Sequence, residues 1–140
     1  MINTKIYKAV YELAEKLMKT AAKDDRETFD ALYAELRAIC IDNENTDKDH
    51  PEQWETLADF TEELEGALAG YEKALEKAIA IDSSDHIASI GFSMAMLQAE
   101  TGQTGAAITS LRQAKTSAQR TEDDDLKADI DELLEKLTTG

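Results

Sequence analysis

The chain has 140 residues, enough for one domain that buries a core without disulfides or metal ions. Its 15 basic and 30 acidic residues give a formal charge of −15, so nucleic acid and anionic membranes are poor partners. One Pro and six Gly, in a sequence rich in Ala, Leu, Glu and Lys, predict an all-α protein. The acidic surface either serves solubility alone or attracts a basic partner.

Several features bear on the compartment. Cys40 is the single cysteine, so no disulfide can form within the chain, which favours a reducing compartment. The first residues, Met1–Ile6, have no apolar core of the kind that a signal peptide needs. No window of 18 apolar residues is present. We therefore expect a cytoplasmic protein without a membrane partner.

Apolar residues at helical spacing predict seven helices in chain order. They cover about residues 4–22, 24–42, 51–65, 67–81, 85–100, 105–119 and 122–138. The expected buried faces include Leu17 and Met18 in the first helix, Ile41 in the second and Ile79 in the fourth.

Cap and turn residues predict where these helices begin and end. Asp24, with Glu27 three residues later, predicts a capping box at the start of the second helix. Residues 42–50 form the longest non-periodic segment and predict a loop, after which Pro51 occupies the first turn of the third helix. Gly66 is expected to close the third helix.

Two short sequence patterns recur along the chain and indicate an internal repeat. Gly66, Leu75 and Ala78 recur 36 residues later as Gly102, Leu111 and Ala114. Residues 38–42 recur 40 residues later as residues 78–82. A period of about 34 to 40 residues in helical sequence is typical of stacked helix pairs. The prediction is one domain over residues 1–140, a right-handed α-α superhelix of three pairs (about 4–42, 50–82 and 85–119) closed by a capping helix (about 122–138).

At this point the chain resembles the tetratricopeptide repeat (TPR) family over about residues 5–118. The family's first-helix pattern of large and small residues is matched by Val10, Leu13, Ala14 and Leu17, and by Trp54, Leu57, Ala58 and Thr61. Its turn glycine and second-helix pattern are matched by Gly102, Ala107, Leu111 and Ala114. The departures are Asn43 and Ser83 where Pro usually closes a repeat, Gly91 and Gln98 at large positions, and Tyr71 at a small one.

The resemblance implies a groove, lined by the first helix of each pair, that holds a peptide or a partner's helix. Carried over residue by residue, its lining is Lys8, Tyr11 and Glu15, then Glu52, Glu55, Asp59, Glu62 and Glu63, then Phe92 and Met96. The acids stand where carboxylate-clamping members carry Lys, Asn and Arg, which argues against an acidic-tail chaperone adaptor. Two alternatives stay open: the acids form a solvated face, and Phe92 and Met96 belong to the core.

No arrangement of residues supports catalysis, a cofactor or a specific metal site. The loop after Asp42 does not meet the EF-hand spacing, which leaves only weak, nonspecific cation binding there. His50 and His86 lie at predicted helix starts, where capping or solvent exposure is expected. Cys40 falls on an apolar stripe and is expected to be a buried small residue.

The sequence therefore leads to two hypotheses of function, neither of them enzymatic. The first is an adaptor or small chaperone-like module that binds a basic or mixed peptide in an acidic groove. The second is a self-assembling unit in which the fifth or the last helix forms a homodimer interface.

Overall fold

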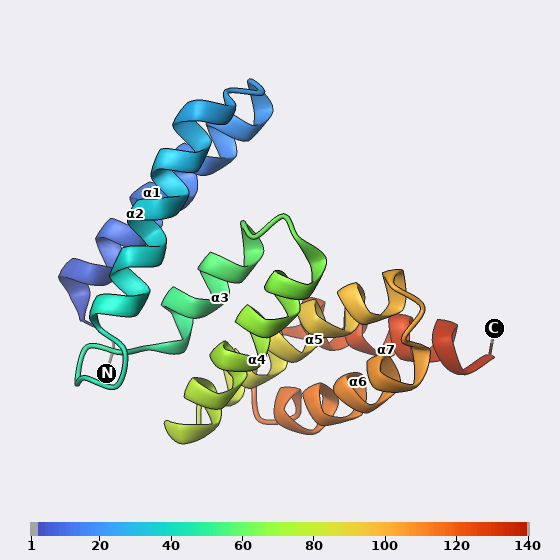
Figure 1. Cartoon of the computed structure of the whole chain (residues 1–140). Coiled ribbons are helices and arrows are strands. Elements are labelled where there is room, and N and C mark those ends of the chain that lie inside the picture. The colour runs from blue at the N-terminus through green and yellow to red at the C-terminus, as the bar shows by residue number, and fades with distance from the viewer. Residues whose placement is uncertain (1–2, 140) are drawn as a thin grey trace. The chain divides into compact units, whose positions relative to one another are not determined.

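The computed structural model describes residues 3–139, and every regular element in this part of the chain is an α-helix (Figure 1). The all-α prediction is confirmed. In chain order the helices are α1 (Thr4–Ala22), α2 (Arg26–Asp42), α3 (Pro51–Asp59), α4 (Leu64–Ala80), α5 (Ser84–Glu100), α6 (Thr104–Ala118) and α7 (Asp124–Thr139). None of the described helices has the length and apolar character needed to cross a bilayer.

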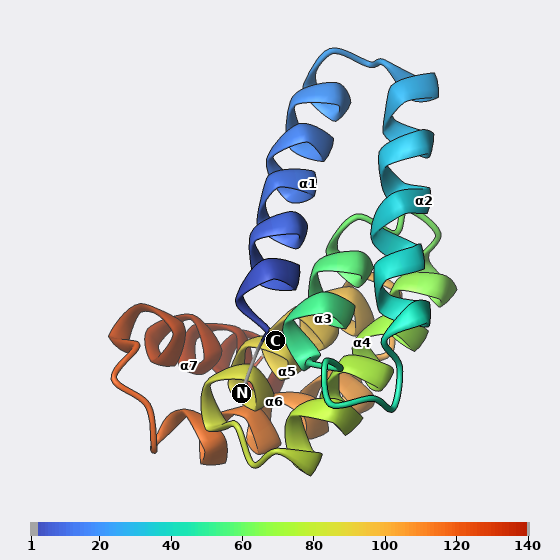
Figure 2. The same cartoon turned by 90° about the vertical axis from the view of Figure 1, so that its left-hand side faces the viewer.

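The chain divides into two compact units, residues 1–70 and residues 71–140, with the boundary inside α4. In the first unit, α1 and α2 form the predicted first pair and run antiparallel beside each other, and α3 packs on both (Figures 1 and 2). Its core residues come from all three helices: Val10, Leu13 and Leu17, then Phe29, Leu36 and Cys40, then Trp54, Leu57 and Ala58.

The second unit is built on the predicted pairing of α5 with α6, and α7 packs mainly on α6 and also on α5. Small residues dominate the core between them: Ala88, Ala95, Ala107, Ala114 and Ala118, with Leu111 and Ile130. Short side chains let helix axes approach closely, so this pair is tight. Phe92 and four leucines of α7 (Leu126, Leu133, Leu134 and Leu137) pack against the outside of this core.

Three of the helices end in the same way, which explains the short connections that follow them. Asp24, Asp82 and Gly102, just after α1, α4 and α5, adopt left-handed φ angles of 56°, 52° and 80°. In each case the next backbone N–H bonds to a carbonyl five residues back, at 2.9, 3.0 and 2.8 Å. This is the Schellman motif, and in each case a new helix starts within two residues of the left-handed residue.

The boundary between α3 and α4 differs from the prediction. The amides of Phe60 and Thr61 bond to carbonyls three residues back, which tightens the last turn and ends α3 at Asp59. Gly66 does not close α3, because α4 already begins at Leu64. The second helix is capped by Asp25, whose side chain accepts a bond from the Thr28 amide at 3.2 Å, so the capping box predicted at Asp24 is wrong.

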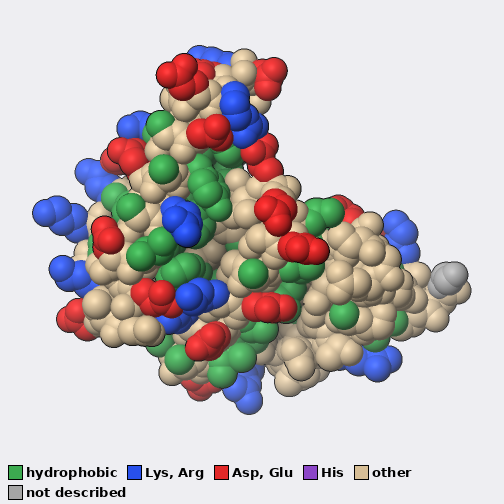
Figure 3. Space-filling view, in the orientation of Figure 1, with side chains coloured by type: hydrophobic (Ala, Val, Ile, Leu, Met, Phe, Trp, Pro, Cys, Tyr) green, Lys and Arg blue, Asp and Glu red, His purple; other side chains and the backbone are tan. Residues whose placement is uncertain are grey.

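Several residues predicted on buried faces are exposed instead. Met18, Ile41 and Ile79 are 63%, 47% and 59% exposed. Figure 3 shows hydrophobic side chains lying on the surface among charged ones. Apolar spacing places a residue on a helix face, but it does not say whether another helix covers that face.

Candidate peptide-binding site

A hollow between α5 and α7 brings two predicted site residues together. Phe92 and Met96, one turn apart on α5, form its floor with Leu133 of α7. Asp129, Glu132 and Lys136 of α7 form its charged rim. All four α7 residues share one helix face, because their positions differ by three, four and seven.

The hollow suits a side chain better than a cofactor. It holds about 190 Å³, less than the cavities that enclose drug-sized ligands. Met96 is 43% exposed, and Phe92 and Leu133 are half-buried, so the floor is apolar and open to solvent. Two acids and one lysine give the rim a charge of −1. The arrangement can take an aliphatic side chain from a partner and pair with a basic group beside it.

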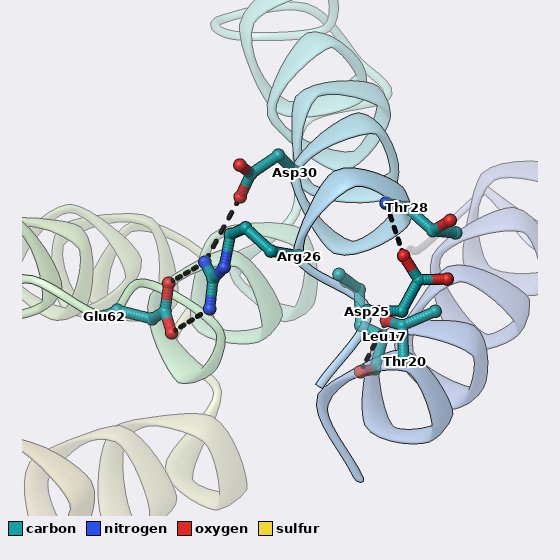
Figure 4. Close-up of polar contacts among 7 residues, drawn as sticks. All are labelled: Leu17, Thr20, Asp25, Arg26, Thr28, Asp30 and Glu62. Atoms are coloured by element: carbon teal, nitrogen blue, oxygen red, sulfur yellow. Dashed lines mark hydrogen bonds and ion pairs between the residues drawn. The ribbon is translucent and has the colours of Figure 1, made fainter. Parts of the chain in front are cut away.

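A second hollow, of about 200 Å³, lies in the first unit and is polar. Its lining includes Thr20, Asp24, Asp25 and Phe29. Arg26 and Glu62, which form an ion pair, also line it. The Arg26 Nη1 and Nη2 atoms lie 2.5 and 2.8 Å from the Glu62 carboxylate oxygens, and Nη1 is also 3.2 Å from Asp30 (Figure 4). The Arg26 guanidinium lies 5.0 Å from the centre of the Phe29 ring.

This ion pair keeps both partners charged. The hydrogen bond from Arg26 lowers the pKa of Glu62, and the bond to Glu62 raises the pKa of Arg26. Glu62 was predicted to line a groove on the third helix. It lies instead in the turn after α3, and its carboxylate joins that turn to the start of α2. We therefore assign Glu62 to the structure of the first unit.

The other predicted residues are placed as follows. Lys8, Tyr11 and Glu15 are exposed on α1, and Tyr11 is 58% exposed. On α3, Glu52 and Glu55 are half-buried and Asp59 is exposed, while Glu63 is exposed in the turn that follows.

The α7 side of the hollow was not predicted from the sequence; it is formed by Asp129, Glu132, Leu133 and Lys136. The last helix was predicted to be a cap or a homodimer face, and not part of a peptide site. The signal was present, because α7 carries charged residues and a leucine on one face at helical spacing.

The histidines and the cysteine lie where the sequence predicted. The Nδ1 atom of His50 accepts a bond from the Glu52 amide at 3.1 Å and caps α3. The His86 amide donates to Ser83 Oγ at the start of α5. Cys40 is fully buried, and its thiol donates to the Gln53 carbonyl at 3.3 Å. Burial raises the pKa of Cys40 to about 12, so the thiol stays protonated at neutral pH.

Comparison with known proteins finds no matching family model, no similar curated protein and no similar solved structure. The resemblance to the TPR family therefore stays a prediction.

Proposed function

We propose that this chain is a protein-interaction module that binds a basic or mixed peptide segment. The observation that carries the proposal is the α5–α7 hollow, where Phe92, Met96 and Leu133 form an apolar floor beside Asp129 and Glu132. An aliphatic side chain of the peptide contacts the floor, and a neighbouring Lys or Arg pairs with the acids. Lys136 pairs with an acidic group where the peptide is mixed.

The finer architecture belongs to this proposal as well. A right-handed superhelix of TPR-like pairs is supported by the pairing of α1 with α2 and of α5 with α6, and by their matching turns. Glu52, Glu55 and Asp59 lie on one face of α3, at positions that differ by three and seven, and are proposed as further contacts for a basic segment. A cytoplasmic location is also proposed, because Cys40 is a free thiol.

The proposal is tested by fluorescence anisotropy with three labelled peptides of equal length. The first has one leucine flanked by lysines, the second has serine in place of the leucine, and the third has glutamates in place of the lysines. We expect only the first to bind, and its affinity to fall as salt is added. Equal binding of all three peptides, or of none, would contradict the proposal.

Variants then locate the site. Met96→Lys is expected to weaken binding of the first peptide about tenfold or more, because it removes apolar contact and adds repulsion. The double variant Asp129→Lys/Glu132→Lys should transfer the preference to the glutamate peptide. Glu135→Lys is the matched control, because Glu135 is exposed on α7 and does not line the hollow. If the control weakens binding as much as Met96→Lys, the hollow is not the site.

The alternative function is self-assembly through the fifth or the last helix. The exposure of Met96 favours it, since a second copy can contact the same apolar floor. In that case the mass in solution should rise with protein concentration, and Met96→Lys should abolish the rise.

A further inference from the structure

Helix α1 carries two apolar seams, each with the alternating four- and three-residue spacing of a coiled coil. One seam consists of Ile6, Val10, Leu13, Leu17 and Thr20, and its three central residues are buried in the first unit. The other seam consists of Tyr7, Tyr11, Ala14, Met18 and Ala21, and we call it the outer seam. Tyr7, Tyr11 and Met18 are 44%, 58% and 63% exposed, so the first unit leaves the outer seam uncovered.

The segment that carries the outer seam has a net positive charge on an acidic chain. Residues 4–23 contain five lysines and two glutamates, a local charge of +3 on a chain of −15. Figure 3 shows Lys and Arg side chains gathered along the left-hand edge, over α1. Two copies of this chain repel each other through their net negative charge, and α1 is a segment in which acids do not predominate. Pairing at α1 therefore does not bring two acidic faces together.

The side chains of the outer seam complement themselves in an antiparallel pairing. In the heptad notation of coiled coils, Tyr11 and Met18 occupy a positions, and Tyr7 and Ala14 occupy d positions. In an antiparallel pairing, each a position of one helix contacts a d position of its partner. With Tyr11 set opposite the partner's Ala14, Tyr7 comes opposite the partner's Met18. The large Tyr11 ring then packs on the small Ala14, and the Tyr7 ring contacts the Met18 sulfur; both arrangements are favourable. In a parallel pairing each tyrosine would lie opposite the same tyrosine of the partner, and Ala14 opposite the partner's Ala14. The tyrosine layers would then be overpacked, and the Ala14 layer would leave a gap.

The flanking charges support the same register. Lys8 and Glu15 occupy equivalent positions beside the outer seam, one heptad apart. Both are e positions of the heptad, and in an antiparallel pairing the e positions of the two helices lie beside each other across the interface. Lys8 then lies opposite the partner's Glu15, and Glu15 lies opposite the partner's Lys8. The two-fold axis relates these two ion pairs to each other, as expected of an isologous interface.

We propose that two copies of this chain associate through antiparallel pairing of α1 along the outer seam. This interface is separate from the α5–α7 hollow and does not depend on peptide binding there. It also gives Lys8, Tyr11 and Glu15, predicted as lining of a peptide groove, a role between copies of the chain.

Sedimentation equilibrium of the full chain and its variants tests the proposal. The wild type should show a monomer–dimer equilibrium. Lys8→Glu places a carboxylate opposite the partner's Glu15, and Glu15→Lys places an ammonium opposite the partner's Lys8. We expect each single variant to weaken the dimer roughly tenfold, because attraction at two sites becomes repulsion. An equimolar mixture of the two variants should form a heterodimer, since each interface site then joins opposite charges.

Controls separate this interface from general charge effects and from misfolding. Lys16→Glu makes the same charge change at an exposed position of α1 outside both seams, and it should leave the dimer unchanged. Recovery of the dimer in the mixture shows that both single variants are folded. A wild type that is monomeric at every concentration overturns the proposal. So does a dimer that Lys8→Glu, Glu15→Lys and their mixture leave unaffected.

Discussion

Gly91 of α5 and Ala114 of α6 lie so close that a β-carbon added to Gly91 would be 3.0 Å from the Ala114 β-carbon. Gly91 departs from the TPR pattern, which has a large residue at this position. The structure gives the reason for the glycine, because α5 and α6 meet there with almost no side chain between them. The approach of these helices holds the core on which α7 and the proposed site rest.

Gly91→Ala should therefore destabilise the second unit. The added methyl group must displace Ala114 or separate the helices, at a cost of about 1–3 kcal/mol. Urea unfolding followed by circular dichroism measures the loss as a lower midpoint. Gly105→Ala in the first turn of α6 is the matched control, because an added β-carbon there meets no atom within 4 Å. It should stabilise the chain by up to about 1 kcal/mol, and a loss of stability at Gly105 equal to that at Gly91 would contradict the packing explanation.

Asp24→Gly should stabilise the chain by about 0.5–1 kcal/mol. The φ angle of 56° at Asp24 is unfavourable for a residue with a β-carbon, and glycine removes that cost. The opposite change at the equivalent turn, Gly102→Ala, should destabilise by about 1–2 kcal/mol, although space is open around Gly102. Thermal unfolding compares the two variants. Shifts of the same sign at both turns would show that the left-handed backbone is not the cause.

The Cys40 thiol should not react with a disulfide reagent in the native protein at pH 8 and should react fully in urea. Burial and a pKa of about 12 keep the thiolate population very small in the folded chain. The colour released by the reagent measures both states. Rapid reaction of the native protein would contradict the burial of Cys40.

The same thiol makes the free energy of unfolding decrease at alkaline pH. Its folded pKa of about 12 lies above the ordinary thiol value of about 8.5. Its contribution to stability is complete below the ordinary value and is lost as the pH rises toward the folded value. Cys40→Ala should therefore remove part of the decline in stability between these pH values.

Glu62→Gln should lower stability slightly at neutral pH, because it removes the carboxylate that holds Arg26. The pKa of Glu62 is lowered in the folded chain, so its contribution is present above the unfolded value of about 4.3 and is lost as the pH falls through the folded one. The difference between the variant and the wild type should vanish in acid and shrink in high salt. Glu63→Gln, at the exposed neighbouring position, is the control and should change little. A difference that persists at low pH would show that Glu62 acts through packing.

Some helix limits follow from the local sequence and others do not. The ends of α1, α2 and α5 follow local cap and turn chemistry, and their predicted limits were correct to within two residues. The predicted end of the third helix at Gly66 is wrong, because glycine is tolerated in the first turn of a helix as well as after the end of one. Just after α3, the Thr61 hydroxyl donates to the Leu57 carbonyl at 2.8 Å and lies 2.7 Å from that of Tyr33 on α2. The spacing of residues along α3 does not reveal this contact with another helix.

The sequence by itself determined that the protein is helical and where most of its helices begin and end, since periodicity, caps and turn residues act within a few residues of one another. Only the tertiary structure decided which apolar faces are covered, so Leu17 is fully buried while the adjacent Met18 is 63% exposed. Only the tertiary structure paired Arg26 with Glu62 and joined Phe92 to Leu133 of α7. These contacts depend on how whole helices pack, and the spacing of residues along one helix carries no information about the helix that packs against it.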